Sequence, residues 1–498
     1  FSLFFDRKYS KRLQNALQHR QENSLYSQQV QQLMSKTLVT IDPMASVFDA
    51  ARLMSEHSIS CLAVVDDRQS LLGIVTDRDL RQRVIAEQRS YTDSVQKIMT
   101  PQPIVTTTTA FADQAILLMV QNNIHHLPVL ENNHPVAMLT VSDIVRQQKS
   151  EPILLMSTIY KSQSVDELVL ASHNIKGLLQ NLIAADIKAE ALGRLLTTVT
   201  DALTGRLIQL AQQQLGPEPV PFVWLAFGSQ GRQDQSAKSD QDNGLLLDDS
   251  VRPEHDAYFA QLAGFVCDGL DACGYVYCPG NIMATNSQWR QPLQAWQKHF
   301  SQWVQQPETK ALMHASIFFD LRMIFNSADD DELMASLQGS LQGLLQNQRF
   351  LAGLTLNALD LQPPLGFFKQ FVVDRKGQHK DTFDIKKQGL MPLTDIARIH
   401  ALANAVPHVN SMERLHALND SNMLEAGQAS NLLDAHEFIA HLRLVHQGQQ
   451  MDQGLAPDNN INPDQLSGLL QRQLKDAFQI VRDAQKSLRL RYANDLPS

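Results

Sequence analysis

The sequence predicts a multidomain protein in which α/β modules precede an all-helical C-terminal region. Three observations lead to this fold class. The chain has 498 residues, which is more than one hydrophobic core usually holds. Its first third repeats itself, and its middle places two apolar, strand-like runs around a glycine turn. In its last third, apolar residues recur at helical spacing.

The composition narrows the classes of function. Hydrophobic residues make up 43% of the chain and charged residues 19%, as in globular proteins. The net charge of −9 comes without a basic block, which argues against a nucleic-acid partner. No apolar run approaches the roughly 18 residues that a membrane helix needs. We therefore expect a cytoplasmic protein with no membrane partner.

The chain opens with "FSLFFDRKYSKRLQ", which has neither an initiating methionine nor a signal peptide. We therefore expect a fragment whose N-terminal domain is missing, and we read residues 1–29 as a helical linker. The cysteines have no histidine among them and fit no common zinc pattern, so we expect buried, reduced thiols. They are Cys61, Cys267, Cys273 and Cys278.

The repeat in the first third has a period of about 65 residues. "SISCLAVVDD" (Ser58–Asp67) aligns with "NIHHLPVLEN" (Asn123–Asn132). "GIVTDRDL" (Gly73–Leu80) aligns in the same way with "AMLTVSDI" (Ala137–Ile144). Each copy predicts the order strand, helix, strand, strand, helix.

Residues 30–149 resemble a pair of cystathionine-β-synthase (CBS) domains, which pack as one unit and often bind adenine nucleotides. The resemblance rests on the strand-to-helix turns, with Thr76 and Asp79 in one copy and Thr140 and Asp143 in the other. It implies that each Asp binds the ribose of AMP, ADP or ATP and each Thr lies near the phosphates. Thr and Asp are also good N-cap residues, so plain helix capping stays open. We expect a homodimer through this pair.

Residues 150–215 show helical spacing and are predicted to form a connector. A loop then leads to the apolar run "VWLAF" (Val223–Phe227), the turn Gly228–Ser229 and the run "GLLLDD". On this predicted second strand Asp240 and Asp242 are two residues apart, so both side chains share a face. Two neighbouring carboxylates repel each other unless a cation lies between them. A divalent metal is the first hypothesis.

The Gly-Ser turn followed by Asp-x-Asp within residues 216–329 resembles the DNA-polymerase-β-like nucleotidyltransferases. Within that group it is similar to the uridylyltransferase acting on the PII nitrogen-signalling protein and to glutamine-synthetase adenylyltransferase. It looks most like a bacterial family of nucleotidyltransferases coupled to CBS pairs, often with an upstream cyclic-nucleotide-binding domain. The resemblance implies an NTP substrate and two Mg²⁺ ions held by Asp240 and Asp242.

The same resemblance assigns the phosphates of the NTP. Gly228 would let the backbone approach them, and the Ser229 hydroxyl would donate to them. Arg232 and Lys238 could neutralise the leaving pyrophosphate, although a solvent-exposed charge explains each of them equally well.

The sequence departs from the wider superfamily around the acidic pair. Gln241 and Asn243 are polar where apolar residues are preferred, and "GYVYCPGNIMATNSQW" carries no third acid. Asp320 is the best substitute for that catalytic carboxylate. A structural ion pair between Asp320 and Arg322 explains the same residue about as well.

Residues 330–498 are predicted to form a helical bundle, which resembles the substrate-binding domain of the CBS-linked family. In it Lys386, Lys387 and Arg398 could meet phosphate or an acidic partner, or lie on a solvated helix face.

Together these patterns predict a signal-transduction enzyme that moves a uridylyl or adenylyl group from an NTP to a protein or small-molecule hydroxyl. Adenine nucleotide in the CBS pair would regulate it. The alternative is a catalytically inactive, nucleotide-sensing regulatory protein. The missing third acid favours the alternative, whereas the intact Gly-Ser and Asp-x-Asp disfavour it.

Overall fold

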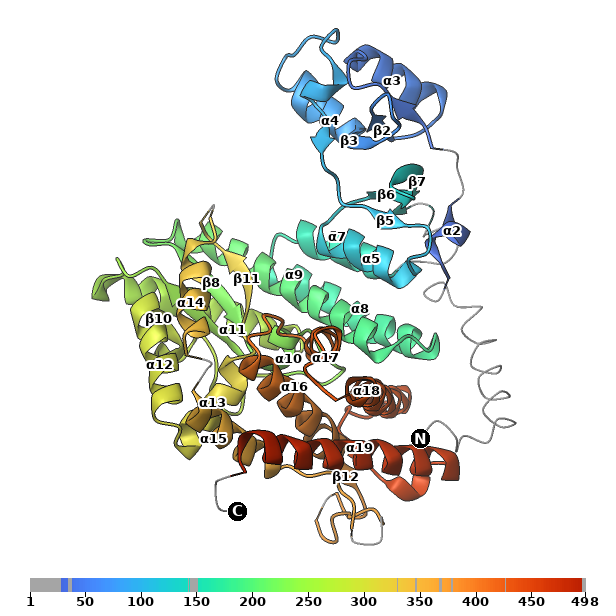
Figure 1. Cartoon of the computed structure of the whole chain (residues 1–498). Helices are drawn as coiled ribbons and strands as arrows, with labels where there is room; N and C mark the ends of the chain where they lie inside the picture. Colours follow the sequence, from blue (N-terminus) through green and yellow to red (C-terminus); the bar gives the residue numbers. More distant parts are fainter. Residues whose placement is uncertain are drawn as a thin grey trace. The chain divides into compact units, whose positions relative to one another are not determined.

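The chain divides into two compact units (Figure 1): Phe1–Thr158 with Ala184–Ile187, and Ile159–Ile183 with Lys188–Ser498. The computed structural model describes residues 28–34, 38–141, 143, 151–328, 330–344, 347–366, 370–377, 379–425 and 427–494. All but the last two residues of the predicted linker at 1–29 lie outside these ranges.

The first repeat forms a four-stranded sheet in the order β1-β2-β3-β4. Its elements are β1 (Thr40–Ile41), α3 (Val47–Glu56), β2 (Cys61–Val65), β3 (Leu71–Thr76), α4 (Asp77–Asp79), the π-helix η2 (Leu80–Ile85), the 3-10 helix η3 (Val95–Lys97) and β4 (Thr100–Pro101). Ser46 caps α3 by accepting from the Asp49 N–H at 3.1 Å, and α3 buries Val47, Ala50 and Met54 in the core of this repeat.

The second repeat forms the sheet β5-β6-β7. Its elements are β5 (Thr106–Thr107), α5 (Ala112–Gln121), β6 (His126–Glu131) and β7 (His134–Thr140). The short helix α2 (Val30–Leu33) joins this repeat, since the N–H of Val30 donates to Ala110 at 2.8 Å. Both repeats thus show the first four elements of the predicted order strand, helix, strand, strand, helix. The final helix is present in the first repeat as α4 and η2, and in the second repeat it falls largely outside the described residues. The two repeats touch where the Ser60 hydroxyl meets the His126 ring at 2.9 Å.

The second unit is built around a mixed sheet in the order β10-β9-β8-β11. The strands are β8 (Phe222–Ala226), β9 (Asn243–Leu247), β10 (Arg290–Pro292) and β11 (Arg322–Asn326). β9 runs antiparallel to β8 and parallel to β10, and β11 runs antiparallel to β8. Every residue of β8 and β9 is buried, as the two apolar runs predict.

The predicted connector forms three helices. They are α7 (Glu151–Lys161), α8 (Val165–Ala184) and α9 (Ala189–Leu215). Most of α7 belongs to the first unit, whereas nearly all of α8 and the whole of α9 belong to the second. α9 packs along α11 (Asp256–Ala272), and a Cβ added at Gly269 would lie 2.5 Å from Leu207, so the two helices approach closely.

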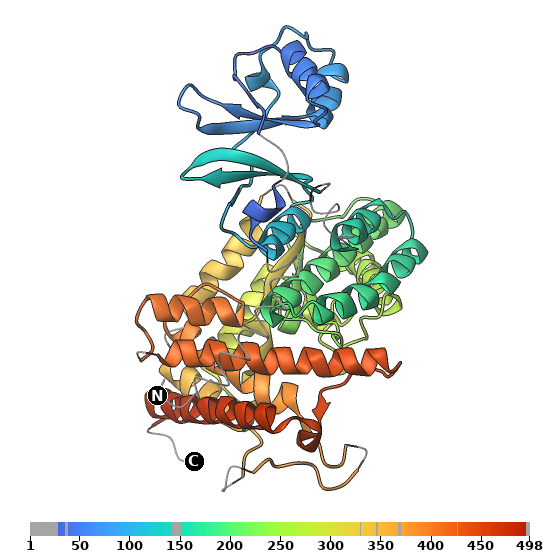
Figure 2. The same cartoon turned by 90° about the vertical axis from the view of Figure 1, so that its right-hand side faces the viewer.

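Helices complete the second unit. They are α10 (Gly228–Arg232), α12 (Leu293–Gln305), α13 (Thr309–Phe318), α14 (Glu332–Gln342), α15 (Gln348–Leu359), the π-helix η6 (Lys386–Leu390), α16 (Met391–Ala403), α17 (Ser411–Asp420), α18 (Gln428–Asp452) and α19 (Gly468–Tyr492). The long helices α18 and α19 lie side by side (Figure 2). The region predicted to be all-helical also contains a short strand pair, β12 (Phe383–Asp384) with β13 (Asn460–Ile461).

One continuous apolar core joins the sheet to the C-terminal helices. Val223 and Leu246 of the sheet belong to the same buried cluster as Phe350, Ile396 and Phe478. The sheet and the helices therefore form one body, and a site on the sheet can use side chains of both. None of the helices in the described ranges is long and apolar enough to cross a lipid bilayer.

Candidate functional site

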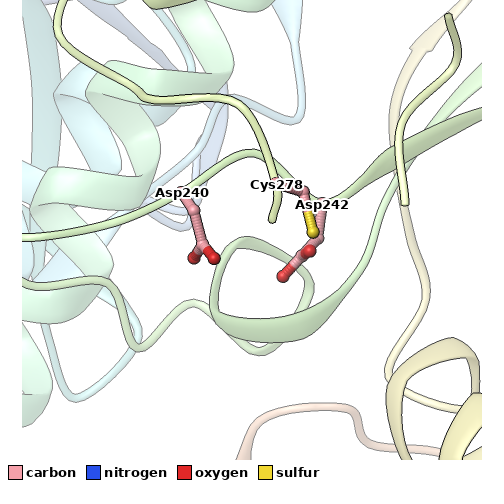
Figure 3. Close-up of side chains that lie close together, drawn as sticks. All are labelled: Asp240, Asp242 and Cys278. Carbon is pink, nitrogen blue, oxygen red and sulfur yellow. The ribbon is translucent and has the colours of Figure 1, made fainter. Parts of the chain in front are cut away.

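The two aspartates lie in an extended segment just before β9, where the chain leaves α10. Asp240 forms an isolated parallel bridge with Val276, and the carbonyl of Asp242 accepts from the Phe227 N–H at 2.9 Å. Between them Gln241 is buried, so both carboxylates point the other way (Figure 3). The shared face that their spacing predicts is present, although β9 itself begins at Asn243.

Gly228 is required at the start of α10 for two reasons. Its φ of +56° is a conformation that side-chain-bearing residues rarely adopt. A Cβ added there would lie 2.4 Å from Oδ2 of Asp242. The glycine therefore gives the Asp242 carboxylate the room in which it lies, and Ser229 follows on the rim of the adjacent pocket.

The two polar departures from the superfamily pattern have structural roles. The Gln241 amide donates to the carbonyls of Cys267 at 3.0 Å and Tyr275 at 2.7 Å. The Asn243 side chain accepts from the Ala284 N–H at 2.8 Å. Both side chains hold the acidic segment against residues 275–284. An apolar side chain at either position could not form these hydrogen bonds.

This tie brings Cys278 to the acidic pair. Ligand atoms of Asp240, Asp242 and Cys278 all lie within 4.8 Å of one another (Figure 3). Within the described residues they are the one group of three Asp, Glu, His or Cys side chains arranged to hold a metal ion. We expected an inert buried thiol here, but Cys278 is only partly buried and lies close enough to Asp242 to lower the pKa of that carboxyl.

The electrostatics of the pair favour a bound cation. Burial, and then the neighbouring charge of Asp240, raise the pKa of Asp242 above its ordinary value. A cation between the two carboxylates would offset both the desolvation and the repulsion.

A pocket of about 60 Å³ is lined by both α10 and the C-terminal helices, and it contains basic side chains together with the acidic Glu190 and Asp234. Ser229 and Arg232 come from the α10 segment, Lys386 from η6 and Arg443 from α18. Burial and the charge of Arg443 lower the pKa of Lys386, while Asp240 and Asp242 act in the opposite sense. Lys386 is thus close enough to feel both carboxylates.

Arg443 is a buried cation and Lys386 a partly buried one, and neither forms an ion pair within the part of the chain that the structure describes. Arg443 is 6% exposed and donates only to the amide oxygen of Asn459, at 2.8 Å. Burial lowers the pKa of Arg443 to about 10. A buried cation without an acid is costly, so the pocket favours an anionic ligand.

Arg232 and Lys238, which the sequence also predicts to contact phosphate, lie in different surroundings. Arg232 is bound to Asp234 at 2.8 Å and Asp320 at 2.9 Å, so its charge is already shared by two carboxylates. Lys238 is exposed, as the solvated alternative describes.

Asp320 does not join the acidic pair. It is completely buried and binds three arginines, none of which is Arg322. Its oxygens accept from Arg398 at 3.0 and 2.5 Å, from Arg414 at 2.6 Å and from Arg232 at 2.9 Å. Burial alone would raise the pKa of Asp320, but the three guanidinium groups hold it below its ordinary range. With both oxygens engaged, this carboxylate is a structural ion-pair centre, not a third metal ligand.

The proposed partner of Asp320 was also wrong. Arg322 binds Asp201 of α9 at 2.8 Å and donates to the backbone carbonyls of Gln230 at 3.0 Å and Gly231 at 3.3 Å. It therefore anchors the end of α10 to α9.

Replacing Asp320 by Ala should destabilise the second unit by about 3–5 kcal/mol, because it leaves three buried arginines short of a carboxylate. The shift of the urea unfolding midpoint measures this loss. Asp476→Ala, at an exposed position of α19, is the matched control and should change stability by no more than about 0.5 kcal/mol. A loss below about 1 kcal/mol for Asp320→Ala would contradict the structural role.

The strand-to-helix turns of the first unit have matching geometry. The Thr76 hydroxyl donates to Asp79 at 2.7 Å, and the Thr140 hydroxyl donates to Asp143 at 2.6 Å. In each turn the backbone N–H of the Asp donates to the Thr hydroxyl at 3.3 Å. In both turns the Thr and the Asp therefore form the hydrogen bonds of a helix cap. Asp79 also forms an ion pair with Arg83 at 3.3 Å.

Comparison with known proteins assigns the first unit. The family model of the CBS domain matches residues 30–86 and again 95–150. This part of the chain is a CBS pair. It is 39% identical over 114 residues to the CBS domain-containing protein CBSCBSPB2 of Arabidopsis thaliana, covering 23% of this chain and 21% of that protein. It is 30% identical over 116 residues to the uncharacterized protein YlbB of Bacillus subtilis, covering 23% and 78%.

Solved structures are similar to the same CBS pair. A "putative signal-transduction protein with CBS domains" from Burkholderia ambifaria is 31% identical, with 24% of this chain and 92% of that chain covered and a TM-score of 0.23. CBSX2 in complex with AMP is 29% identical, with 24% and 93% covered and a TM-score of 0.21. The chain spans only about a fifth of the length of CBSCBSPB2, CBSCBSPB3 and CBSCBSPB5 of Arabidopsis thaliana.

Two further family models match the second unit. Residues 173–310 match "Putative nucleotidyltransferase DUF294", and residues 348–492 match "Putative nucleotidyltransferase substrate binding domain". The first segment contains the acidic pair and Cys278, and the second contains Lys386 and Arg443. The two matched segments therefore meet at the site. Asp320 lies between them, and α9, which we assigned to the connector, lies in the first.

Proposed function

We propose that this protein is a signal-transduction nucleotidyltransferase that moves a nucleotidyl group from an NTP to the hydroxyl of a protein or small molecule. One observation carries the proposal. The carboxylates of Asp240 and Asp242 lie near the partly buried Lys386 and the buried Arg443, and neither cation has a carboxylate within ion-pair distance in the described structure. A ligand that fits must bring both a cation and an anion.

A metal-bound nucleoside triphosphate carries both charges. Its metal would satisfy the two carboxylates, and its phosphates would satisfy Lys386, Arg443 and the Ser229 hydroxyl. Because burial strengthens each of these interactions, such a ligand gains more here than on an open surface. A metal ion alone would leave the two cations unpaired, and a free anion would face the repulsion of the carboxylates.

The donor set fits the divalent metal that the family resemblance implies. Asp240 and Asp242 supply two oxygens, and the missing Cβ at Gly228 leaves Asp242 the space to bind. When bound, divalent ions supply charge neutralisation on the triphosphate and activation of the incoming hydroxyl. The chain itself orients the phosphates with Lys386 and Arg443, and it closes one side of the site with the C-terminal helices.

The finer features are part of the same proposal. A uridylyl or adenylyl group is transferred, in keeping with the resemblance to the polymerase-β-like enzymes acting on the PII protein and glutamine synthetase. Adenine nucleotide held at Thr76, Asp79, Thr140 and Asp143 regulates the transfer, and the CBS pair forms a homodimer.

A second candidate function rests on Asp320. Because its oxygens are bound by arginines, no third carboxylate joins Asp240 and Asp242 within the described residues. A protein that binds metal–NTP without transferring it, as a sensor, would need no third acid. Incubation with each labelled NTP, Mg²⁺ and host-cell extract separates the two, because only the enzyme yields a labelled product.

The double variant Asp240→Asn, Asp242→Asn should fold normally and lose metal-dependent NTP binding. Folding persists because the change relieves the repulsion between two partly buried charges. Calorimetric titration with Mg·NTP measures the loss, and Asp476→Asn is the exposed control. Binding by the double variant as tight as that of the parent would show that the metal site is elsewhere.

Lys386→Met and Arg443→Met should have two effects of opposite sign. Each should weaken Mg·NTP binding by about 1.5–3 kcal/mol, or roughly tenfold or more, through loss of a charge-assisted hydrogen bond. Each should also raise the melting temperature of the empty protein, because a buried unpaired charge is removed.

Lys387→Met is the matched control for these variants, since Lys387 is the exposed neighbour of Lys386 and should change neither quantity. Unchanged nucleotide affinity in both buried variants would contradict the assignment of the pocket to the triphosphate.

Adenine nucleotide should raise the melting temperature of the CBS pair in the full chain. When free nucleotide exceeds its Kd a hundredfold, binding stabilises the folded pair by about 2.7 kcal/mol. Asp79→Ala and Asp143→Ala should each reduce this ligand-induced shift beyond any change in the ligand-free melting temperature. Asp67→Ala, in an exposed turn, is the control. If millimolar AMP, ADP and ATP give no shift in the parent, only the capping role of these residues remains.

A further inference from the structure

Backbone contacts on both sides place the Cys278 thiol at the acidic pair. Before it the Gln241 N–H donates to Val276 O at 3.0 Å, and after it the Asn243 N–H donates to Ile282 O at 3.1 Å. Between these bonds Cys278 lies in a turn closed by Asn281 N–H to Cys278 O at 2.9 Å. The chain is therefore fixed against the acidic segment twice, with the thiol between the two fixed points.

The thiol comes from the segment in which the third carboxylate was expected. The segment "GYVYCPGNIMATNSQW" is the one that we aligned with the matching strand of the adenylyltransferase and found to contain no acid. In the structure it reaches the pair all the same, and the side chain that it presents is sulfur (Figure 3).

We propose that Cys278 is the third protein ligand of the metal held by Asp240 and Asp242, and that this position therefore prefers a borderline divalent ion such as Zn²⁺ or Co²⁺ to Mg²⁺. This inference rests on the proposed function and names the metal class of its site. Mg²⁺ prefers oxygen ligands and water, whereas thiolate sulfur selects softer ions. Any second ion that enters with the triphosphate is bound mainly by phosphate oxygens and can remain Mg²⁺.

The change on binding is a simple exchange. When the metal enters, a sulfur–metal bond forms, the S–H bond of Cys278 breaks and the proton leaves to solvent, with no oxidation of any group.

The remaining cysteines of the second unit have other surroundings. The thiol of Cys267 is buried and donates to Asn243 at 3.6 Å, and Cys273 is buried on the wall of a separate cavity. Neither belongs to the group that could hold a metal. Cys273→Ser is therefore a control that removes a thiol from the same unit while leaving the proposed ligand in place.

The test uses the full chain, freed of metal by a chelator, and adds Co²⁺ or Cd²⁺ without nucleotide. The parent and Cys273→Ser should show a sulfur-to-metal charge-transfer band in the ultraviolet. Cys278→Ser and Cys278→Asp should lack it. Cys278→Ser should weaken Co²⁺ binding by about tenfold or more while changing Mg²⁺ binding little, and Cys278→Asp should shift the preference toward Mg²⁺. Unfolding midpoints check that each variant is folded.

A band that persists in Cys278→Ser would overturn the inference, as would its absence in the parent. Equal losses of Co²⁺ and Mg²⁺ affinity in that variant would also overturn it, since they indicate a merely structural thiol. These outcomes are separable from the proposed function. A thiolate band without any transfer activity would support Cys278 as a metal ligand and contradict the enzyme. Mg²⁺-supported transfer without a band would support the enzyme and contradict Cys278 as a ligand.

Discussion

The carboxylate of Asp320, shared by Arg232, Arg398 and Arg414, is the interaction on which the site depends. Arg232 ends α10, next to the glycine turn, whereas the other two arginines lie on C-terminal helices α16 and α17. Asp234 and Asp395 complete the cluster, so three buried positive charges meet three negative ones. Removal of any one partner would leave a charge in the cluster unpaired. The cluster therefore fixes α16 and α17 relative to α10, beside the acidic pair.

That position gives the site its two kinds of charge. The α/β part supplies the carboxylates, which need a cation, and the helical part supplies Lys386 and Arg443, which need an anion. No carboxylate lies within ion-pair distance of Lys386 or Arg443 in the described chain, whereas Asp320 is bound by three arginines. Unpaired buried charges reduce stability, so a pocket that keeps them is best explained by a ligand that pairs with both. These charges are the physical basis for proposing a nucleotide site here.

Local patterns in the sequence predicted the parts of this site that local geometry controls. The two-residue spacing of Asp240 and Asp242 gives their common face, and Gly228 marks the tight approach beside them. Contacts between distant segments could not be predicted in this way. Arg322 is two residues from Asp320 in the sequence yet binds Asp201. The sequence left Lys386 between a phosphate contact and a solvated helix face, and only the folded chain places it on the wall of a pocket. The role of Cys278 depends on Gln241 and Asn243, which looked like departures from the family pattern before their hydrogen bonds were known.

The most direct test of the account is a crystal structure of the full chain with a non-hydrolysable NTP analogue and a divalent metal. The account predicts a metal ion on Asp240 and Asp242, with the phosphates within hydrogen-bonding distance of Ser229, Lys386 and Arg443. Asp320 should keep its three arginines in that complex. A nucleotide bound elsewhere, or one whose phosphates leave Lys386 and Arg443 without an anion, would contradict the central claim that the two sets of charges form one nucleotide site.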